Sequence, residues 1–573
     1  MSGTDHFTAI IFKRMWLPAV ISSIGWALSD VADAVVVGQR MGTVGLAAIA
    51  LILPVYMINC MFAHGLGIGG SVRYARLLGE GKPREAVESF NHILQAALLL
   101  SGLTAVAGNL FMTPLLQALG TVPADGALFE ATKAYLRILV SATPFFYLSN
   151  ILNYYLRNDD NGKLAGAGSV VGNVADIALN VLFVVFLDFG TAGAALSTMI
   201  GQLIAIAIYL PGLLGKAHIL QIKAIKPVPA YACAVLREGF SSSVQYFFSL
   251  VFLLICNNVL IRTGNHLSVA VFDMLQNASY LILYLYEGTN RAMQPLVSTY
   301  HGEHREDGKR IGLHYAFIYG LTVGGTLTAL IFAFPQLICT LFGLREAAAI
   351  QLGSYALRLY CVGALFAGVS ILLAGYFQSC ARESESLMLA TLRGGAVLLP
   401  ATLLFSLLGG AAFWLLFPVT EALSLGLWLL SVKCRKAKAE PFDQGRVWRG
   451  AIRQGNEEIG ELTAGAEAFC ERWDANTKQT YFVAMTIEEV CLAILQNGFR
   501  NHNDKCIDIT LVAQQDGMFV LHIRDNALLF NPFALVTSKG GADNEFSIDV
   551  AGMRVITNKA KEFFYRRYGG FNS

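Results

Sequence analysis

The sequence has few charged residues. Asp, Glu, Lys and Arg together make up 14% of its 573 residues, whereas a water-soluble domain contains roughly 25%. Apolar residues make up 55%, and the mean hydropathy is +0.53. This deficit of charge excludes an ordinary water-soluble protein for most of the chain and indicates a protein embedded in a lipid bilayer.

Several chemical motifs are also missing. The ten cysteines are scattered without CxxC spacing or a neighbouring ligand histidine, so neither a disulfide framework nor a zinc site is predicted. The apolar part contains no Walker loop, catalytic triad or metal-binding cluster, which argues against a pump driven directly by ATP. No small-residue cleavage site follows the first apolar stretch, so we expect that stretch to be retained as a helix.

Long apolar runs recur from Ile11 to Leu430. Because about 20 apolar residues cross a bilayer as a helix, we predict an all-α polytopic membrane domain over residues 1–435. It would contain twelve transmembrane helices in two six-helix halves, at about 10–215 and 230–433. The predicted spans are 11–38, 46–71, 90–113, 133–156, 165–187, 191–214, 234–261, 267–298, 311–335, 350–378, 386–408 and 411–432.

Lys and Arg gather in alternate loops, and this asymmetry sets the orientation of a membrane protein. The intervening loops, such as 121–130 and 187–191, contain few basic residues. We therefore expect an even number of spans in the inner (cell) membrane, with both termini in the cytoplasm. The basic clusters lie at 13–14, 73–84, 216–226, 305–310 and 433–438.

The two halves show a faint repeat at one constant offset. Gly65 and the Gly79-Glu80 pair recur as Gly288 and the Gly302-Glu303 pair, and a basic cluster follows each pair. Leu152 and Tyr154 line up with Gly375 and Phe377 at the same offset. Because both halves would begin on the same side, the repeat would be parallel, with a central cavity between the halves.

The texture changes after Lys433, where charges become frequent and no further run is long enough to span a membrane. The alternation of Ile507, Ile509 and Leu511 predicts a strand, and Asp516-Gly517 predicts a hairpin turn. We therefore predict a linker over 436–456 and a cytoplasmic α/β sandwich over 457–573.

Polar residues inside the spans are candidates for function, since a charge at the bilayer centre costs roughly 2.5–3.5 kcal/mol. Asp30 and Asp33 share one face of the first span, and Asp176 and Asn180 share one face of the fifth. If these faces meet, their oxygen atoms suit a sodium ion or carry a proton as the coupling ion. The alternative is that they are structural hydrogen bonds between helices.

The eighth span supplies a second set of candidates, for contacts with a small-molecule substrate or a second ion. Glu287 and Arg291 lie one turn apart, so a local ion pair is the simpler interpretation. Arg393 and Glu421, in the last two spans, predict a structural ion pair. The remaining candidates are Asp273 and Tyr284, the latter with Tyr280 and Tyr286 in a wall that attracts cations or in ordinary packing.

Residues 10–432 resemble the multidrug and toxin extrusion transporters of the polysaccharide-exporter superfamily. The resemblance implies twelve helices and the export of bulky organic cations in exchange for sodium ions or protons, with the coupling ion at Asp33. Two departures concern the fifth span, where the family's Asn and Asp are exchanged, and Asp30, where an Asn is usual. The resemblance rests on Ser29–Asp33, Val36–Gly38, Gly45–Ile49, Gly67–Gly70, Leu77–Gly81, Gly172–Val174, Gln294–Val297 and Tyr300–Gly302.

Residues 460–572 resemble the GHKL ATPase fold, and most closely the serine kinases that act as anti-sigma factors. The resemblance implies that Glu489 takes the position of the general base, Asp525 that of the adenine-reading residue, and Gly552 part of a phosphate-binding turn. Ala493 stands where the magnesium-binding Asn is expected, and Ala527 where a Gly is expected. We therefore expect a regulatory or docking module in which ATP binding is possible and kinase activity is weak or absent.

Together these observations predict a secondary antiporter that exports organic cations or other small amphipathic compounds in exchange for sodium or protons. The expected partners are a small-molecule substrate, the lipid bilayer and a cytoplasmic regulatory protein bound to the tail, without nucleic acid. No catalytic residue, resident metal or further cofactor is expected. Two alternatives stay open, which are a flippase for a lipid-linked glycan and a membrane sensor that signals through its tail.

Overall fold

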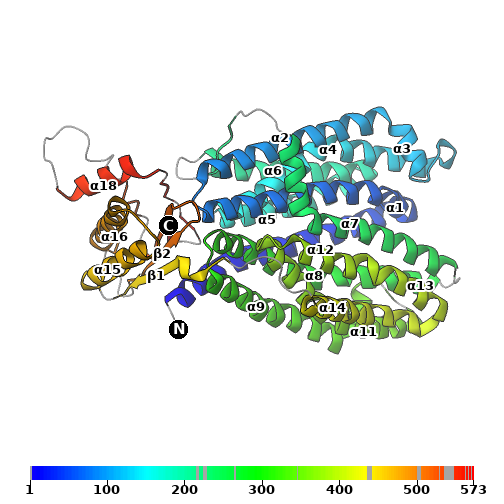
Figure 1. The fold of residues 1–573 in the computed structure, drawn as a ribbon. Coiled ribbons are helices and arrows are strands. Elements are labelled where there is room, and N and C mark those ends of the chain that lie inside the picture. The colour runs from blue at the N-terminus through cyan, green and yellow to red at the C-terminus, as the bar shows by residue number, and fades with distance from the viewer. Residues whose placement is uncertain are drawn as a thin grey trace.

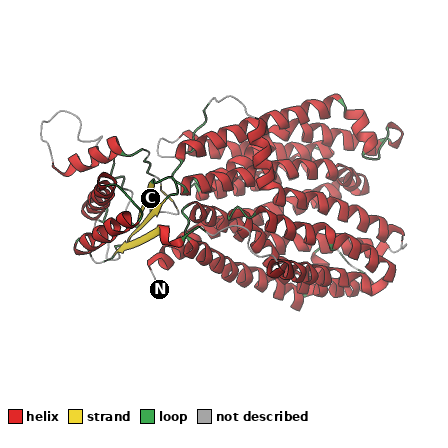
Figure 2. Cartoon of the chain, viewed as in Figure 1, coloured by secondary structure: helices red, strands yellow, loops and turns green. Residues whose placement is uncertain are grey.

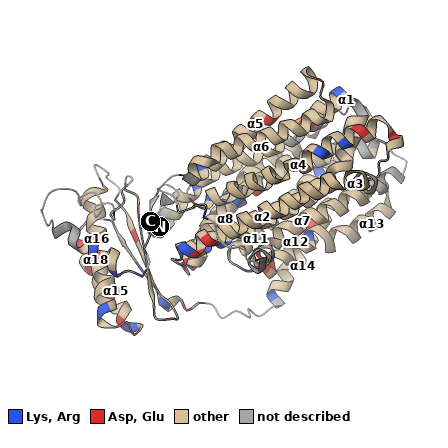
Figure 3. Ribbon diagram, turned by 90° about the horizontal axis from the view of Figure 1, so that it is seen from above, with Lys and Arg blue, Asp and Glu red and all other residues tan. Residues whose placement is uncertain are grey.

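The computed structural model describes residues 3–159, 161–214, 219–223, 229–262, 266–342, 344, 346–434, 442–453, 455–499, 505–527, 530–533, 548–561, 563–565, 567–568 and 571–573. Long helices form a bundle, and a smaller domain with a β-sheet lies at one end of it (Figures 1 and 2). Both chain termini lie at this end. The bundle helices are mostly uncharged along their length, while charges concentrate near their ends and in the small domain (Figure 3).

The first helix, α1 (Gly3–Gly79), contains 77 residues and folds back on itself. In a straight helix, Trp26 and His64 would lie about 57 Å apart, yet their rings are separated by 6.0 Å. A Cβ atom placed at Gly45 would lie 2.6 Å from Met41 Cβ and 2.7 Å from Val37 Cγ1. The helix therefore consists of two antiparallel arms that turn near residue 45, which match the first two predicted spans.

The other bundle helices coincide with the remaining ten predicted spans. Within the described residues, nine segments are long and apolar enough to cross a membrane. The first arm of α1, α4 and α8 lie in the same bundle and are more polar. The elements are α2 (Pro83–Leu110), α3 (Met112–Ala118), α4 (Ala127–Asn158), α5 (Gly162–Asn180), α6 (Gly190–Leu214), α7 (Pro229–Arg262), α8 (His266–Gly302), α9 (Glu306–Ala333), α10 (Pro335–Leu341), α11 (Ala347–Ser379), α12 (Glu383–Thr391), α13 (Leu398–Leu408) and α14 (Leu416–Cys434), with short π-helical turns Val181–Phe186 and Leu392–Ala396.

The internal repeat is present in the helices themselves. The bounds of α9 and α10 are those of α2 and α3 shifted by the offset that relates Gly79 to Gly302. At the C-terminal ends of α4 and α11 the offset is smaller by two positions, so the match of Leu152 and Tyr154 with Gly375 and Phe377 is displaced by that amount. The two halves therefore lose register between their third and fourth helices, which the sequence pattern did not show.

Contacts between the halves follow the same repeat. A Cβ at Gly79 would clash with the carbonyl oxygen of Thr299, and a Cβ at Gly302 would clash with that of Arg76. Arg76 and Thr299 are related by the same offset as the two glycines. The contact of Gly79 with Thr299 is therefore repeated in the contact of Gly302 with Arg76. This reciprocity is that of a two-fold related interface, and it brings the ends of α1 and α8 into backbone contact.

In its described residues, the C-terminal domain contains one antiparallel sheet beside three α-helices. The strand order is β1-β2-β3-β5-β4, in which the last two strands contain two residues each. Strand β1 lies within the stretch assigned to a linker, so the sheet begins earlier in the chain than expected. The elements are β1 (Val447–Ile452), α15 (Glu457–Arg472), α16 (Thr477–Asn497), β2 (Ile507–Ala513), β3 (Phe519–Asp525), α18 (Ile548–Lys559), β4 (Arg567–Tyr568) and β5 (Phe571–Asn572).

Strand β2, which lies between β1 and β3, is buried along its whole length. Ile507, Ile509 and Leu511 pack into a core with the helices of the domain. Asp508 and Thr510 point to the opposite face because side chains alternate along a strand, and there they contact the membrane domain. Both faces of the sheet are therefore covered, one by helices and one by the end of the bundle.

Candidate functional site

The first arm of α1 and helix α5 are joined by a ladder of two polar contacts. The Ser29 hydroxyl donates to Asp176 Oδ2 over 2.9 Å, and Asn180 Nδ2 donates to Asp33 Oδ1 over 2.5 Å. Each helix supplies one donor and one acceptor, four residues apart in the sequence. Residues at this spacing share a helix face. The structure thus places Asp33, Asp176 and Asn180 side by side, whereas the side chain of Asp30 lies outside the described residues.

Asp176 lies in a polar but enclosed environment. The residue is 6% exposed, and among the described residues its Oδ1 atom makes no direct hydrogen bond. The neighbouring groups are neutral hydroxyls, those of Ser29 on α1 and of Ser197 and Thr198 on α6. Asn180 is fully buried, and its Oδ1 atom also lacks a hydrogen-bond donor in the described part of the chain. Two oxygen atoms suitable for a hard cation or a proton are therefore available.

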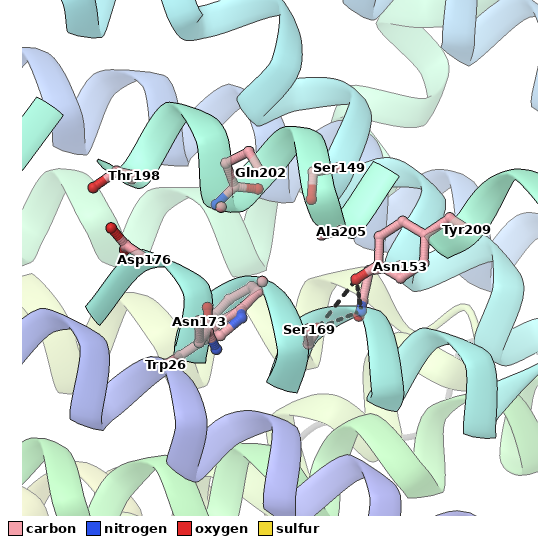
Figure 4. Close-up of a pocket in the computed structure, with 12 residues that line it drawn as sticks. Trp26, Ser149, Asn153, Ser169, Asn173, Asp176, Thr198, Gln202, Ala205 and Tyr209 are labelled. Atoms are coloured by element: carbon pink, nitrogen blue, oxygen red, sulfur yellow. Dashed lines mark hydrogen bonds between the residues drawn. The ribbon is translucent and has the colours of Figure 1, made fainter. Parts of the chain in front are cut away.

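A cavity of about 20 Å³ adjoins Asp176, which is room for one particle of the size of a water molecule. Figure 4 shows Asp176 and Thr198 facing one another at one end of this cavity. At the other end, Asn153 Nδ2 donates to Ser169 Oγ over 2.7 Å and to the Tyr209 hydroxyl over 2.9 Å. Trp26, Ser149, Asn173 and Gln202 complete the polar lining.

The C-terminal half contains a second cavity, of about 50 Å³. Its wall is rich in amide and hydroxyl groups from α7, α8, α11 and α12, and it includes Glu287, Arg291 and Arg393. The cavity has room for a few water molecules. Its polar lining residues are Ser241, Ser242, Gln245, Asn290, Gln294, Ser370, Gln378 and Ser386.

Arg291 reaches from this cavity into the N-terminal half. Its guanidinium lies 4.2 Å from the ring centre of Trp26 and 5.7 Å from that of Tyr154, a geometry that attracts cations to aromatic faces. Among the described residues no ion pair joins it to Glu287, so the predicted local ion pair is not formed. Since Trp26 also lines the cavity beside Asp176, the Trp26–Arg291 contact connects the two polar sites.

The aromatic neighbourhood of Arg291 was not predicted. His64 shares a 2.8 Å hydrogen bond with the Tyr154 hydroxyl and stacks on Tyr246, with ring centres 5.0 Å apart. These residues come from α1, α4 and α7, so only the tertiary fold brings them together. Aromatic residues are frequent in membrane helices, and their sequence carried no signal that singled these out.

The remaining candidates of the C-terminal half have different roles in the structure. Arg393 Nε lies 2.8 Å from both carboxylate oxygens of Glu421, as the predicted structural pair requires. Tyr286 is fully buried against Gly324 and Gly368, so it is a packing residue. Tyr284 is not part of the cavity wall, and the side chain of Asp273 lies outside the described residues.

The tail residues proposed for nucleotide binding are engaged by the chain itself. Asp525 is 2% exposed, and its Oδ1 atom accepts from the Ala527 amide over 2.9 Å and from Asn572 Nδ2 over 2.7 Å. Burial raises the pKa of Asp525 to about 6. The Glu489 carboxylate lies against Gly552 and leaves no room for a Cβ atom there. An adenine ring at Asp525 would have to displace Asn572, so these residues do not fit a bound ATP.

The membrane part of the chain is similar to known proteins. The model of the MatE family matches residues 18–182 and 240–399. The multidrug export protein MepA of Staphylococcus saprophyticus is 22% identical over 398 residues, which cover 68% of this chain and 86% of that protein. The probable multidrug resistance protein YoeA of Bacillus subtilis is 22% identical over 335 residues, which cover 57% and 72%.

Solved structures show the same fold. The MATE multidrug transporter DinF-BH, solved in a complex, is 25% identical with a TM-score of 0.68, and the match covers 76% of this chain and 97% of that one. An outward-facing MATE transporter is 23% identical with a TM-score of 0.68, and the match covers 74% and 95%. Because the family model covers more than half of the residues, this chain belongs to the MatE family of multi-pass membrane transporters.

Proposed function

We propose that this protein is a secondary antiporter that exports organic cations or other small amphipathic compounds in exchange for sodium ions or protons. The observation that carries the proposal is Asp176, a buried carboxylate surrounded by neutral hydroxyls beside a cavity for one small particle. Asp33 and Asn180 lie one helical turn away. A buried carboxylate is costly unless a positive charge compensates it, and a proton or a sodium ion supplies that charge.

The membrane potential can supply the free energy for such an exchange. One elementary charge that crosses the membrane releases about 2.3 kcal/mol per 100 mV. Carboxylate, amide and hydroxyl oxygens from Asp33, Asp176, Asn180 and Ser29 suit sodium, and either carboxylate can carry a proton. In the proposed orientation both termini lie in the cytoplasm, and the protein lies in the cell membrane.

The relatives support export of drugs as the substrate class, since two of them are described as multidrug proteins and one solved structure as a multidrug transporter. The cavity beside Glu287 and Arg291 is the proposed substrate contact of the C-terminal half. Trp26 and Arg291 connect it with the ion site in the other half.

A lipid-linked glycan is the second candidate substrate, and one observation favours it. The C-terminal cavity is lined mainly by hydroxyl and amide groups together with Arg291 and Arg393, which would bind sugar hydroxyls and an acidic group by hydrogen bonds. Two further arginines lie within or beside the spans: Arg358 is exposed, and the side chain of Arg262 lies outside the described residues.

For the tail we propose a GHKL-like regulatory module without kinase activity, which binds a cytoplasmic protein. The order of α16, β2, β3 and α18 and the contact of Glu489 with Gly552 support this fold relationship. The engagement of Asp525 by Asn572 argues against catalysis. Purified protein that phosphorylated a partner in the presence of magnesium and ATP would contradict the proposal.

The function is tested by dye efflux from proteoliposomes under separate sodium and proton gradients. Wild-type protein should drive efflux with one gradient, and Asp33→Asn should abolish it. Asp188→Asn is the matched control, because Asp188 forms an exposed pair with Arg40 outside the site. Absence of gradient-driven efflux in the wild type, with translocation of a fluorescent lipid-linked glycan instead, would replace the antiporter by the flippase.

A further inference from the structure

The C-terminal domain contacts both halves of the membrane domain at the place where the halves meet. This docking surface consists of the turn between the second arm of α1 and α2, at Gly79–Lys82, and the loop between α8 and α9, at Gly302–Arg305. The sheet of the C-terminal domain lies at this end of the bundle (Figure 1). Its polar face, with Asp508 and Thr510, contacts the docking surface at Arg305. The alternation of Ile507, Ile509 and Leu511 in the sequence identified the apolar face of β2, but nothing in the sequence predicted a role for the polar face.

The C-terminal half is held by buried ion pairs. Arg305, which is fully buried, donates to Asp508 over 2.8 Å and to the Thr510 hydroxyl over 3.2 Å. Glu303 and Arg524, which are 1% and 3% exposed, form a second pair. Each of these pairs joins the α8–α9 loop to the sheet. Burial opposes the charged form of Arg305, but the neighbouring carboxylate of Asp508 outweighs it and raises the pKa of Arg305 above its ordinary value.

These pairs are reinforced at their edge. Asp307 at the start of α9 lies 2.9 Å from Arg449 on β1. The rings of His304 and Phe442 stack with centres 3.7 Å apart, and Gln444 donates to the His304 carbonyl over 3.1 Å. Residues on or beside β1, β2 and β3 therefore all contact the α8–α9 loop or the start of α9.

The N-terminal half is held by apolar contacts. Gly81 lies against Val520, whose Cγ1 atom would be 3.1 Å from a Cβ at that glycine. Phe564 packs against the apolar core of the N-terminal half. No ion pair joins this half to the tail among the described residues. Among the described residues, the tail therefore contacts this half through fewer charged groups, with the attraction between Lys82 and Asp516 beside the apolar contacts.

The same surface is where the two halves close on each other. Gly79 and Gly302 are in backbone contact, and Glu238 of α7 accepts from Arg73 of α1 over 2.8 Å and from Arg76 over 3.3 Å. In transporters of this architecture, the substrate cavity opens alternately as the two halves rock apart. A rigid domain bound to both halves prevents their separation on its side.

We infer that the C-terminal domain is a lock on the transport cycle, which rests on the proposed transport function. The domain stays bound to the C-terminal half through the Arg305–Asp508 and Glu303–Arg524 pairs, and it must release Gly81 from Val520 and Phe564 from its packing each time the halves part. Breaking a buried ion pair leaves an uncompensated charge, whereas separating an apolar contact does not. A cytoplasmic partner that binds the tail therefore controls the rate by holding or freeing the N-terminal half.

Two reversible cross-links test this division. In a background with Cys233→Ser and Cys434→Ser, the pair Lys82→Cys and Val520→Cys ties the tail to the N-terminal half through a short methanethiosulfonate linker. The pair Asp307→Cys and Arg449→Cys ties it to the C-terminal half and is the matched control. Efflux from proteoliposomes is measured before linking, after linking, and after cleavage with dithiothreitol.

The N-terminal link should lower efflux by at least about tenfold, because it removes the open state from the population, and dithiothreitol should restore it. The C-terminal link should leave efflux unchanged. Efflux at the unlinked rate with the N-terminal link closed would overturn the lock. Loss of efflux with both links would show that the tail leaves both halves and would overturn the assigned division.

A second readout needs no substrate, so failure of the transport proposal and failure of the lock are distinguishable. Ser243, which is 3% exposed, lies between the halves against Gly65. Ser243→Cys should react with a water-soluble maleimide when the halves part, and the N-terminal link should slow this reaction by a similar factor. An unchanged reaction rate would contradict the lock whether or not any dye is transported.

Discussion

The two halves of the membrane domain share their helix arrangement but differ in where their charges lie. In the N-terminal half, the half-buried Asp33 and the buried Asp176 lie next to neutral amide and hydroxyl groups. The C-terminal half pairs Arg393 with Glu421. The counterpart of Asp33 in the repeat is Cys256, which is buried in an apolar cluster. The carboxylates of Asp33 and Asp176 in the N-terminal half thus lie beside neutral groups, whereas Glu421 in the C-terminal half lies beside a guanidinium.

This difference shows which features the repeat retains. The reciprocal contacts of Gly79 and Gly302 depend on close backbone approach, and any side chain at either position would separate the helices. The polar contacts depend on side chains and not on close backbone approach, and they differ between the halves. The contact of Arg291 with Trp26 then connects the cavity beside Asp176 with the cavity of the C-terminal half.

The largest expected effect comes from removing the buried carboxylate. Asp176→Asn should abolish gradient-driven efflux, with a loss of at least about tenfold, because one driving charge contributes about 2.3 kcal/mol per 100 mV. The substitution keeps an acceptor for Ser29, so the fold should be retained. Efflux under each gradient and thermal stability in detergent are the measurements.

Cys256→Ser is the control in the other half. It should leave the coupling ion and the efflux rate unchanged, since Cys256 lies in an apolar cluster. Equal losses of coupling at Asp176 and Cys256 would show that both halves bind ions and would remove the distinction between them.

The second prediction concerns the ion pair of the C-terminal half. Arg393→Gln leaves Glu421 uncompensated and should lower the free energy of unfolding by about 3 kcal/mol. This value is the lower end of the range for buried pairs, because the two side chains are 21% and 19% exposed. The double variant Arg393→Met with Glu421→Leu should recover most of this loss. Thermal unfolding in detergent measures both, and retained coupling in the double variant would support a structural role. Loss of ion coupling in a stable double variant would contradict it.

The third prediction extends the contrast to Asp525, a buried carboxylate outside the membrane. Its pKa of about 6 lies above the ordinary value of 3.8, so the folded domain binds the proton more tightly than the unfolded chain. Its contribution to stability is therefore largest below pH 4 and is lost as the pH rises through 6, a total of up to about 3 kcal/mol. Asp525→Asn keeps the Oδ1 acceptor and should remove this pH dependence.

Hydrogen exchange of β2 and α16 in the full-length protein, between pH 4 and 8, measures the effect. Exchange in the wild type should accelerate as the pH rises, after correction for the intrinsic rate, whereas Asp525→Asn should show a flat profile. An equal pH dependence in both proteins would place the titrating group elsewhere. Glu457→Gln, at the exposed start of α15, is a control that should behave as the wild type.

The sequence predicted the spans and the glycine repeat because both depend on local composition and fixed spacing. It also identified Asp33, Asp176 and Asn180 as residues whose helix faces could meet, since each pair of polar residues lies on one helix face. It did not predict the Trp26–Arg291 contact or the neighbourhood of His64, which join four helices distant in the sequence. Local spacing suggested that Glu287 pairs with Arg291, but the aromatic rings from the other half hold the guanidinium instead.

The docking of the tail onto the membrane domain could not be predicted from the sequence either. Alternation in β2 identified the apolar face, but Asp508 and Thr510 on the other face are ordinary residues for a solvated strand. Their burial becomes evident only with Arg305 in place. Similarly, the role of β1 as an edge strand beside β2 depends on pairing with residues about 60 positions later, which composition near a presumed linker did not reveal.

The smallest expected effect tests the shared feature of the halves. Gly79→Ala and Gly302→Ala each add a Cβ that clashes with a carbonyl oxygen of the opposite half, Thr299 or Arg76, so each should destabilise the closed arrangement by about 1–3 kcal/mol. Because the two contacts are reciprocal, the two variants should give equal shifts in thermal stability and equal increases in the labelling of Ser243→Cys. Gly102→Ala, where no atom lies within 4 Å of the added Cβ, should have no such effect. A large shift from one glycine alone would mean that the halves close on each other asymmetrically, with the docked tail rather than the repeat deciding which helix end gives way.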